Sequence, residues 1–195
     1  MFDIAAFENM TLLYRNRNRY DSIRYTGCDY SSPGKYFVTI CTAGTKKWFG
    51  NVINGKIYLS EIGQIAFQMW YEMPVHFPFI GLDTFVVMPN HIHGIIIINR
   101  SVEKPIVEAL HATPLPPPDA KFLKNETMSF ISPKPGSLSV VVRSYKSAVT
   151  KNTHKFDNGF YWQPGFYDNI ICTTGQLKRI RKYVLDNPQN WNDNE

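Results

Sequence analysis

The sequence predicts an α+β fold in which helices pack on an antiparallel sheet in a ferredoxin-like arrangement. Three observations favour this class: segments of alternating β-forming residues, an Asn-Gly turn at Asn54 that is typical of a hairpin, and segments whose apolar residues recur at helical spacing. The chain has 195 residues, of which 44% are hydrophobic, and this is enough for one domain with a buried core. The predicted order is strand, hairpin, helix, strand pair, helix, aromatic loop and helix.

Strand signals come before the first predicted helix. Residues 35–41 alternate as a half-buried strand does. Residues 51–59 form a predicted hairpin, because Asn54 and Gly55 tolerate the positive φ angles of its turn. Two further strands are expected around a tight turn at Pro89 and Asn90, and the second of them contains a run of isoleucines.

Three helices are expected, and each has a recognisable start. The predicted capping residues are Ser60 for the first helix, Ser137 for the second, and Thr173 or Thr174 for the last; Thr173 fits a capping box with Gln176. The first helix is predicted over 61–72 and ends because of Pro74. The second is predicted over 138–151, and the last ends at Asn187, since the residue before a proline resists the helical conformation.

Two segments do not fit regular elements. Residues 1–33 are predicted to form a basic N-terminal arm, and residues 34–195 a single domain. Within that domain, residues 100–136 form a proline-rich insertion that cannot pack as helix or strand. Residues 160–171 are unusually aromatic and are expected to form a loop that packs or stacks on bases, and a satellite core cluster is the alternative.

His91 and His93 are the most informative residues of the chain. Side chains alternate along a strand, so the two imidazoles project to the same face, where they could hold one metal ion. Ile95 and Ile97 continue this face and other isoleucines occupy the opposite one, which predicts a central strand covered on both sides. A hydrogen-bonded structural pair is the alternative interpretation of such a motif taken alone.

The last predicted helix contains Tyr183 and Asn187, which are four residues apart and share one helix face. Tyr183 lies at the margin of an apolar stripe formed by Leu177, Ile180 and Val184. The pattern fits an amphipathic helix with a rim tyrosine and an Asn-Pro stop. It also fits a nucleophile followed by an oxygen-donating metal ligand.

Charge favours a polyanionic partner, since the net charge is +5 and the pI is about 9.0. Candidate DNA-contacting residues are Arg15, Arg17, Arg19 and Arg24 in the arm, Arg143 and Lys146 on the second helix, and Lys178, Arg179, Arg181 and Lys182 on the last. A solvated terminal arm is the alternative for the first four.

The cysteines and the N-terminus predict a cytoplasmic protein. The three cysteines are widely spaced and suit a reducing compartment. We see no secretory signal, and the longest aliphatic run is far too short to cross a membrane.

Together these residues resemble the REP-associated tyrosine transposases, which are single-tyrosine HUH transposases of the insertion-sequence-200-like family. The specific block is Met-Pro-Asn-His-Ile-His-Gly at 88–94. Weaker similarities lie at 33–42, 143–148, 162–169 and 183–188. Each is weak singly, but their order along the chain matches the family, and the resemblance covers most of the chain. One departure is Asn169, where such proteins usually carry histidine, and asparagine cannot shuttle a proton near neutral pH.

The resemblance implies a nicking and joining enzyme that acts on single-stranded or hairpin DNA. Tyr183 would attack a phosphodiester and leave a 5′-phosphotyrosyl link and a free 3′-hydroxyl. His91, His93 and Asn187 would hold Mg²⁺ or Mn²⁺. The family also implies a homodimer, and recognition of a DNA hairpin by the arm.

Two other functions fit the residues. A non-catalytic module could bind single-stranded nucleic acid through aromatic and basic side chains. A metal-dependent DNA hydrolase would use water in place of tyrosine. Tyr161 and Tyr167 are the fallback nucleophiles.

Overall fold

The computed structural model describes residues 30–99 and 134–191. Its elements in chain order are β1 (Gly34–Cys41), η2 (Ala43–Thr45), β2 (Gly50–Ile53), β3 (Lys56–Leu59), α2 (Glu61–His76), β4 (Ile80–Val87), β5 (His91–Ile98), α4 (Leu138–Thr153), β6 (Tyr167–Ile171) and α5 (Thr174–Asp186). The basic arm and the proline-rich insertion were predicted over segments that lie almost entirely outside these residues. Across the described ranges, no helix is long and apolar enough to span a membrane.

Four strands form one antiparallel sheet in the order β4-β5-β1-β6. Helix α2 connects β1 to β4, and α4 connects β5 to β6, which gives the β-α-β-β-α-β order of a ferredoxin-like fold. The predicted fold class is therefore confirmed. The hairpin β2-β3 is an addition between β1 and α2, and its turn has the predicted positive φ angles at Asn54 and Gly55.

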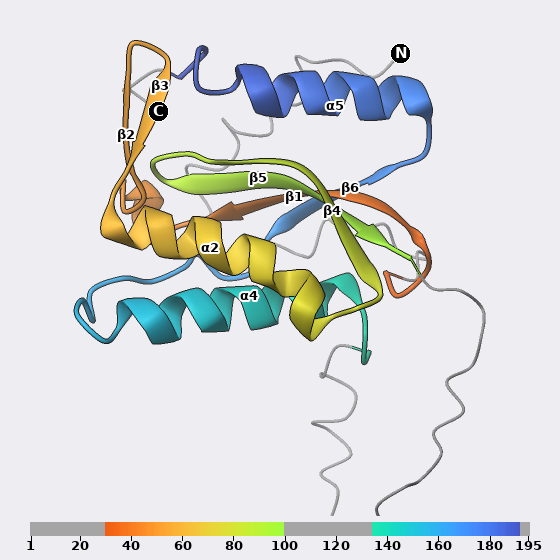
Figure 1. Ribbon diagram of the computed structural model, residues 1–195, viewed down its shortest axis with the longest axis horizontal. Helices are drawn as coiled ribbons and strands as arrows, with labels where there is room; N and C mark the ends of the chain where they lie inside the picture. Colours follow the sequence, from red (N-terminus) through yellow and green to blue (C-terminus); the bar gives the residue numbers. More distant parts are fainter. Residues whose placement is uncertain (1–29, 100–133, 192–195) are drawn as a thin grey trace, which may run out of the picture.

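The two faces of the sheet are covered differently, as Figure 1 shows. Among the described elements, helices α2 and α4 cover one face and α5 covers the other. Strand β5 serves both layers because its side chains alternate: Ile92 and Ile96 enter the α2 and α4 side, while Ile95 packs with Val184 of α5. The predicted division of the isoleucines between two faces is confirmed.

Trp70 is at the centre of the larger core. It is fully buried, stacks on Phe85 and meets Tyr145 of α4 edge-on. Gly94 of β5 makes room for it, because a Cβ atom at that position would lie 2.3 Å from the indole Cζ2. A glycine in the middle of a strand thus serves helix–sheet packing.

The helix starts agree with the sequence at all three positions, and the expected capping hydrogen bond forms at two of them. The Ser60 hydroxyl accepts the Gly63 amide at 3.1 Å, and Thr173 forms the predicted capping box. Ser137 does begin α4, but its side chain makes no capping hydrogen bond and its Oγ is buried without a partner. The Leu138 amide donates instead to the Tyr30 carbonyl at 3.0 Å, so tertiary contact replaces the expected cap.

Two predicted boundaries are wrong. Helix α2 continues through Pro74 to His76, because a proline this close to the end forfeits only one backbone hydrogen bond and Phe77 closes the helix on Met73. The second half of the aromatic segment is the edge strand β6 and not a loop. Its Asp and Asn residues have low β-propensity, and pairing with β1 decides its conformation.

A bulge interrupts β4 next to the α5 face. Leu82 pairs with Ile96 and Phe85 with Gly94, so Asp83 and Thr84 together oppose Ile95. The extra residue keeps Phe85 on the side of Trp70 and presents the bulge to α5.

Candidate active site

The two histidines lie at the first and third positions of β5, directly after the Pro89–Asn90 turn. The Met88 amide donates to the His91 carbonyl at 2.8 Å and closes that turn. The ring centroids of His91 and His93 are 4.4 Å apart, and His93 is buried while His91 is partly exposed. The strand thus brings both imidazoles to one face, as predicted.

Asn90 orients the His91 ring. The Asn90 side-chain oxygen lies 2.7 Å from Nδ1 of His91. Because a carbonyl oxygen only accepts hydrogen bonds, Nδ1 carries the proton and Nε2 presents a lone pair. That Nε2 is buried and has no hydrogen-bond partner. A fixed Nδ1 and an unsatisfied Nε2 are what a metal-ligating histidine needs.

His93 contacts the helix that carries Tyr183. Its Nδ1 lies 2.8 Å from the Thr39 hydroxyl on β1, and its Nε2 lies 3.3 Å from the Tyr183 hydroxyl on α5. Phe37 stacks on the imidazole and meets the phenol ring edge-on. Tyr183 is 42% exposed, so its ring is packed on one side and open to solvent on the other.

Burial keeps both histidines neutral. It lowers the pKa of His91 to about 4. It also lowers the pKa of His93 well below the usual value, and a proton on His91 would lower it further. Neutral imidazole is the form that binds a metal ion, so both side chains suit a divalent cation.

The third predicted ligand, Asn187, is the C-cap residue of α5 and is partly buried. Within the residues described, no three His, Cys, Asp or Glu side chains form a group that could hold a metal ion. An amide or water oxygen would therefore have to complete a site built on the two histidines. Trp191, four residues after Asn187, has its ring 5.9 Å from that of His91, so the end of α5 does lie beside the histidines.

Trp191 and Lys47 were not among the predicted site residues. The Lys47 ammonium lies 5.9 Å from the Trp191 ring, and both therefore lie near the rim of the site by His91. No motif marks them. Lys47 belongs to the segment between β1 and β2, and Trp191 follows the Asn-Pro stop of α5, so only tertiary structure brings them together.

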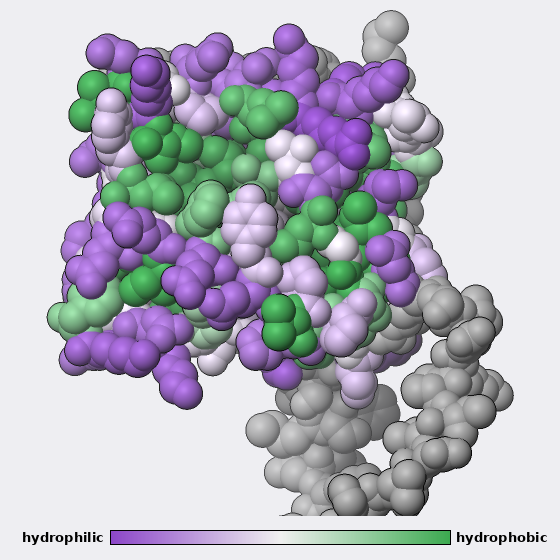
Figure 2. Space-filling view, in the orientation of Figure 1, coloured by the Kyte–Doolittle hydropathy of each residue, from purple (hydrophilic) through white to green (hydrophobic). Residues whose placement is uncertain are grey.

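The cations of α5 differ in their surroundings. Lys178 and Arg179 are exposed, and Lys182 forms a loose ion pair with Asp186 at 3.6 Å. Arg181 is bound to Asp83 of β4. Figure 2 shows hydrophilic residues gathered along the edge where α5 lies, with more hydrophobic residues beneath them.

The predicted DNA-contacting residues on α4 lie away from this site, because α4 covers the opposite face of the sheet (Figure 1). Lys146 donates to the carbonyl groups of Gln163 and Gly165 at 2.6 and 2.9 Å, and burial lowers its pKa to about 8. It holds the loop before β6. Arg143 is exposed on the same helix. The arm residues Arg15, Arg17, Arg19 and Arg24 lie outside the described residues.

The fallback tyrosines are placed less favourably. Tyr161 is exposed and packs on His154 of the α4 C-cap. Tyr167 lies on β6, where it pairs with Thr39 of β1, so β1 separates it from the histidine strand β5. Burial raises the pKa of Tyr167 to about 12. Asn169 pairs with Phe37 and is exposed.

Comparisons with known proteins bear on fold and family. No family model matches the sequence. An uncharacterized protein of Haemophilus influenzae is 33% identical over 180 residues, which cover 89% of this chain and 91% of the relative. A solved structure of a REP-associated tyrosine transposase bound to a REP hairpin covers 90% of this chain and 73% of its own, with a TM-score of 0.51 and 16% identity. The chain therefore belongs to the same family as the Haemophilus influenzae protein and has the fold of the REP-associated tyrosine transposase.

Proposed function

We propose that this protein nicks and rejoins single-stranded DNA, with Tyr183 as the nucleophile. The observation that carries the proposal is the 3.3 Å contact between the Tyr183 hydroxyl and Nε2 of His93. It brings a partly exposed phenol to a pair of neutral imidazoles at the rim of the sheet. Tyr161 packs instead on His154, and Tyr167 lies on β6, which β1 separates from the histidine strand.

The phenol oxygen of Tyr183 attacks phosphorus, and the bond from phosphorus to the 3′-oxygen breaks. The phenol loses its proton and the departing 3′-oxygen gains one, so the products are a 5′-phosphotyrosyl link and a 3′-hydroxyl. The reverse reaction with another 3′-hydroxyl joins strands without an external energy source. An unperturbed tyrosine has a pKa of ~10. Arg179, one helical turn before Tyr183, would assist by favouring the phenolate.

His91 and His93 would hold Mg²⁺ or Mn²⁺ together with Asn187. The fit rests on the unpartnered Nε2 of His91 and on the Nδ1 hydrogen bonds that orient both rings. Such an ion would neutralise charge that develops on the phosphate. Nε2 of His93 lies 3.3 Å from the Tyr183 hydroxyl, so an ion bound at that nitrogen would take the place of this contact and lie beside the phenol.

The proposed substrate is a single-stranded or hairpin DNA. The cations of α5 attract the phosphate backbone, and Trp191 offers a ring on which a base beside the cleaved bond can stack. Lys47 lies near enough to that ring to contact the adjacent phosphate. The basic arm, residues 1–33, would recognise the hairpin, and two chains would act together as a homodimer.

The test uses labelled hairpin DNA with Mn²⁺ and a denaturing gel. The parent and Tyr161→Phe should both give a covalent protein–DNA band, and Tyr183→Phe should give none while it still binds DNA. His91→Ala should abolish cleavage at ordinary metal concentrations. A covalent band that persists in Tyr183→Phe would reject the nucleophile. Cleavage with no covalent band would instead indicate a hydrolase, and binding without cleavage a DNA-binding module.

A further inference from the structure

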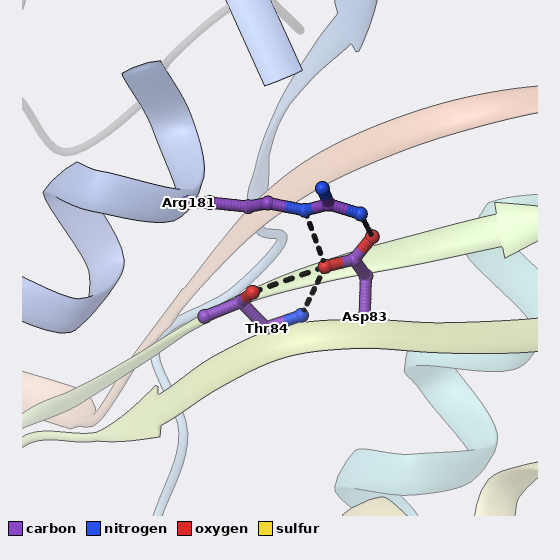
Figure 3. Close-up of polar contacts among 3 residues, drawn as sticks. All are labelled: Asp83, Thr84 and Arg181. Atoms are coloured by element: carbon purple, nitrogen blue, oxygen red, sulfur yellow. Dashed lines mark hydrogen bonds and ion pairs between the residues drawn. The ribbon is translucent and has the colours of Figure 1, made fainter. Parts of the chain in front are cut away.

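An ion pair joins α5 to the β4 bulge on the edge of the sheet (Figure 3). The Arg181 guanidinium donates from Nε to Oδ1 of Asp83 at 2.9 Å and from its terminal nitrogen to Oδ2 at 2.6 Å. A two-point contact of this kind fixes direction as well as distance. The pair therefore restricts how α5 can turn relative to β4.

Asp83 is itself held rigidly. Its Oδ1 accepts the Thr84 amide at 2.7 Å and the Thr84 hydroxyl at 3.0 Å, and its side chain is only 11% exposed. The bulge is what allows this arrangement, because it turns an acidic residue toward α5 without moving Phe85 out of the larger core.

Arg181 and Tyr183 lie on different flanks of α5. Residues two apart on a helix differ by roughly 200° in direction. Leu177 and Val184 form the buried stripe between them. Arg181 reaches toward β4 while Tyr183 packs on Phe37 of β1. Rotation of the helix about this stripe would therefore move the phenol away from His93.

The packing of α5 offers little other resistance to such a rotation. Its buried residues are Leu177 and Val184, with Ile180 partly buried against the same cluster. By contrast, α2 has five buried residues, among them Trp70. A two-point polar contact at the edge would therefore add a restraint on the orientation of α5.

We propose that Asp83 and Arg181 are positioning residues that fix the rotation of α5 and so hold the Tyr183 hydroxyl at His93. This inference rests on the proposed function of Tyr183. It assigns Arg181 a role that differs from the DNA contact predicted from the sequence. If Arg181 instead bound a DNA phosphate, Asp83 would compete with the phosphate for the guanidinium and weaken DNA binding.

The experiment compares the parent with Asp83→Asn, Arg181→Lys and the exchanged pair Asp83→Arg with Arg181→Asp. Leu185→Ala is the matched control, since Leu185 lies on the same helix and is 65% exposed. Hairpin affinity and the rate of covalent adduct formation are measured for each. Hydrogen exchange of α5 and α2 amides is measured without DNA.

Asp83→Asn should slow adduct formation by about tenfold to a hundredfold, because small misplacements of a reacting group have effects of this size. Its hairpin affinity should stay unchanged, exchange should quicken in α5 and not in α2, and the exchanged pair should recover part of the rate. Arg181→Lys, which keeps the charge but loses the second contact, should lie in between.

Two results would overturn the inference. Tighter hairpin binding by Asp83→Asn at an unchanged adduct rate would make Arg181 a phosphate ligand. Unchanged exchange in α5 would remove the positioning role, whatever the adduct rate. If the parent formed no adduct, the proposed function would fail, and faster α5 exchange would still establish that the pair orients the helix.

Discussion

The two faces of the sheet differ in the size of the apolar core that each one buries. On one face, α2 and α4 bury a continuous apolar core that includes Trp70 and Tyr145. On the other, α5 covers a smaller cluster, and the same strand β5 presents His91 and His93 there. A single central strand thus contributes to stability through one set of alternate residues and to the site through the other. The proposed chemistry lies in the thinner layer, whose packing leaves polar groups near the rim of the sheet.

The largest expected effect is on the stability of the α2 face. Trp70→Ala should lower the free energy of unfolding by about 3–5 kcal/mol, since it opens a cavity in a fully buried site. Val75→Ala on the same helix is the control, because Val75 is 77% exposed and its loss should change stability by less than about 0.5 kcal/mol. Urea unfolding checks both. Equal destabilisation by the two variants would contradict the described core.

A smaller loss of stability is expected on the α5 face. Leu177→Ala should cost about 2 kcal/mol, at the low end for a buried leucine, because the thin layer can relax around the change. The Leu177→Ala variant should also form the adduct more slowly, even under conditions where it stays folded, because α5 carries Tyr183. Leu185→Ala is the matched control, because Leu185 is on the same helix and 65% exposed. Adduct rates that fall equally in both variants would refute this difference between buried and exposed leucines.

Lys146 tests whether α4 contributes to DNA binding. Lys146→Met should destabilise the fold by about 1–3 kcal/mol, because two carbonyl groups lose their donor. Hairpin affinity and its salt dependence should stay unchanged. A salt slope reduced by about one, with normal stability, would instead identify Lys146 as a phosphate contact.

The pH dependence of the Asp83–Arg181 pair should be the smallest effect. The hydrogen bond from Arg181 lowers the pKa of Asp83 from 3.8 to about 2. Since the folded pKa is below the unfolded one, the stabilisation is complete above pH 3.8 and is lost as pH falls through about 2. The difference in Tm between the parent and Asp83→Asn should therefore shrink across that window. A difference that stays constant down to pH 2 would contradict the pairing.

Local signals made much of the fold predictable. The β2-β3 hairpin follows from Asn54 and Gly55, and the start of α5 from the capping box of Thr173. The shared face of His91 and His93 follows from strand alternation alone. The placement of Tyr183 beside them required the family resemblance, because no spacing in the chain predicts how α5 crosses the sheet.

The remaining features depend on tertiary contacts. Strand β6 forms because β1 offers it a partner, and its Tyr-Asp-Asn start gives no strand signal. The bulge at Asp83 is defined by how β4 pairs with β5, and no local pattern in the sequence predicts that register. Trp191 lies beside His91 because of the path that the chain takes after α5, which the sequence does not predict.

The most direct test of the account is to identify the residue that becomes linked to DNA. The parent is incubated with hairpin DNA and Mn²⁺, digested with protease and nuclease, and the modified peptide is sequenced by mass spectrometry. We expect a nucleotide on Tyr183, within the segment that contacts His93. A nucleotide on Tyr167 or Tyr161 would contradict it.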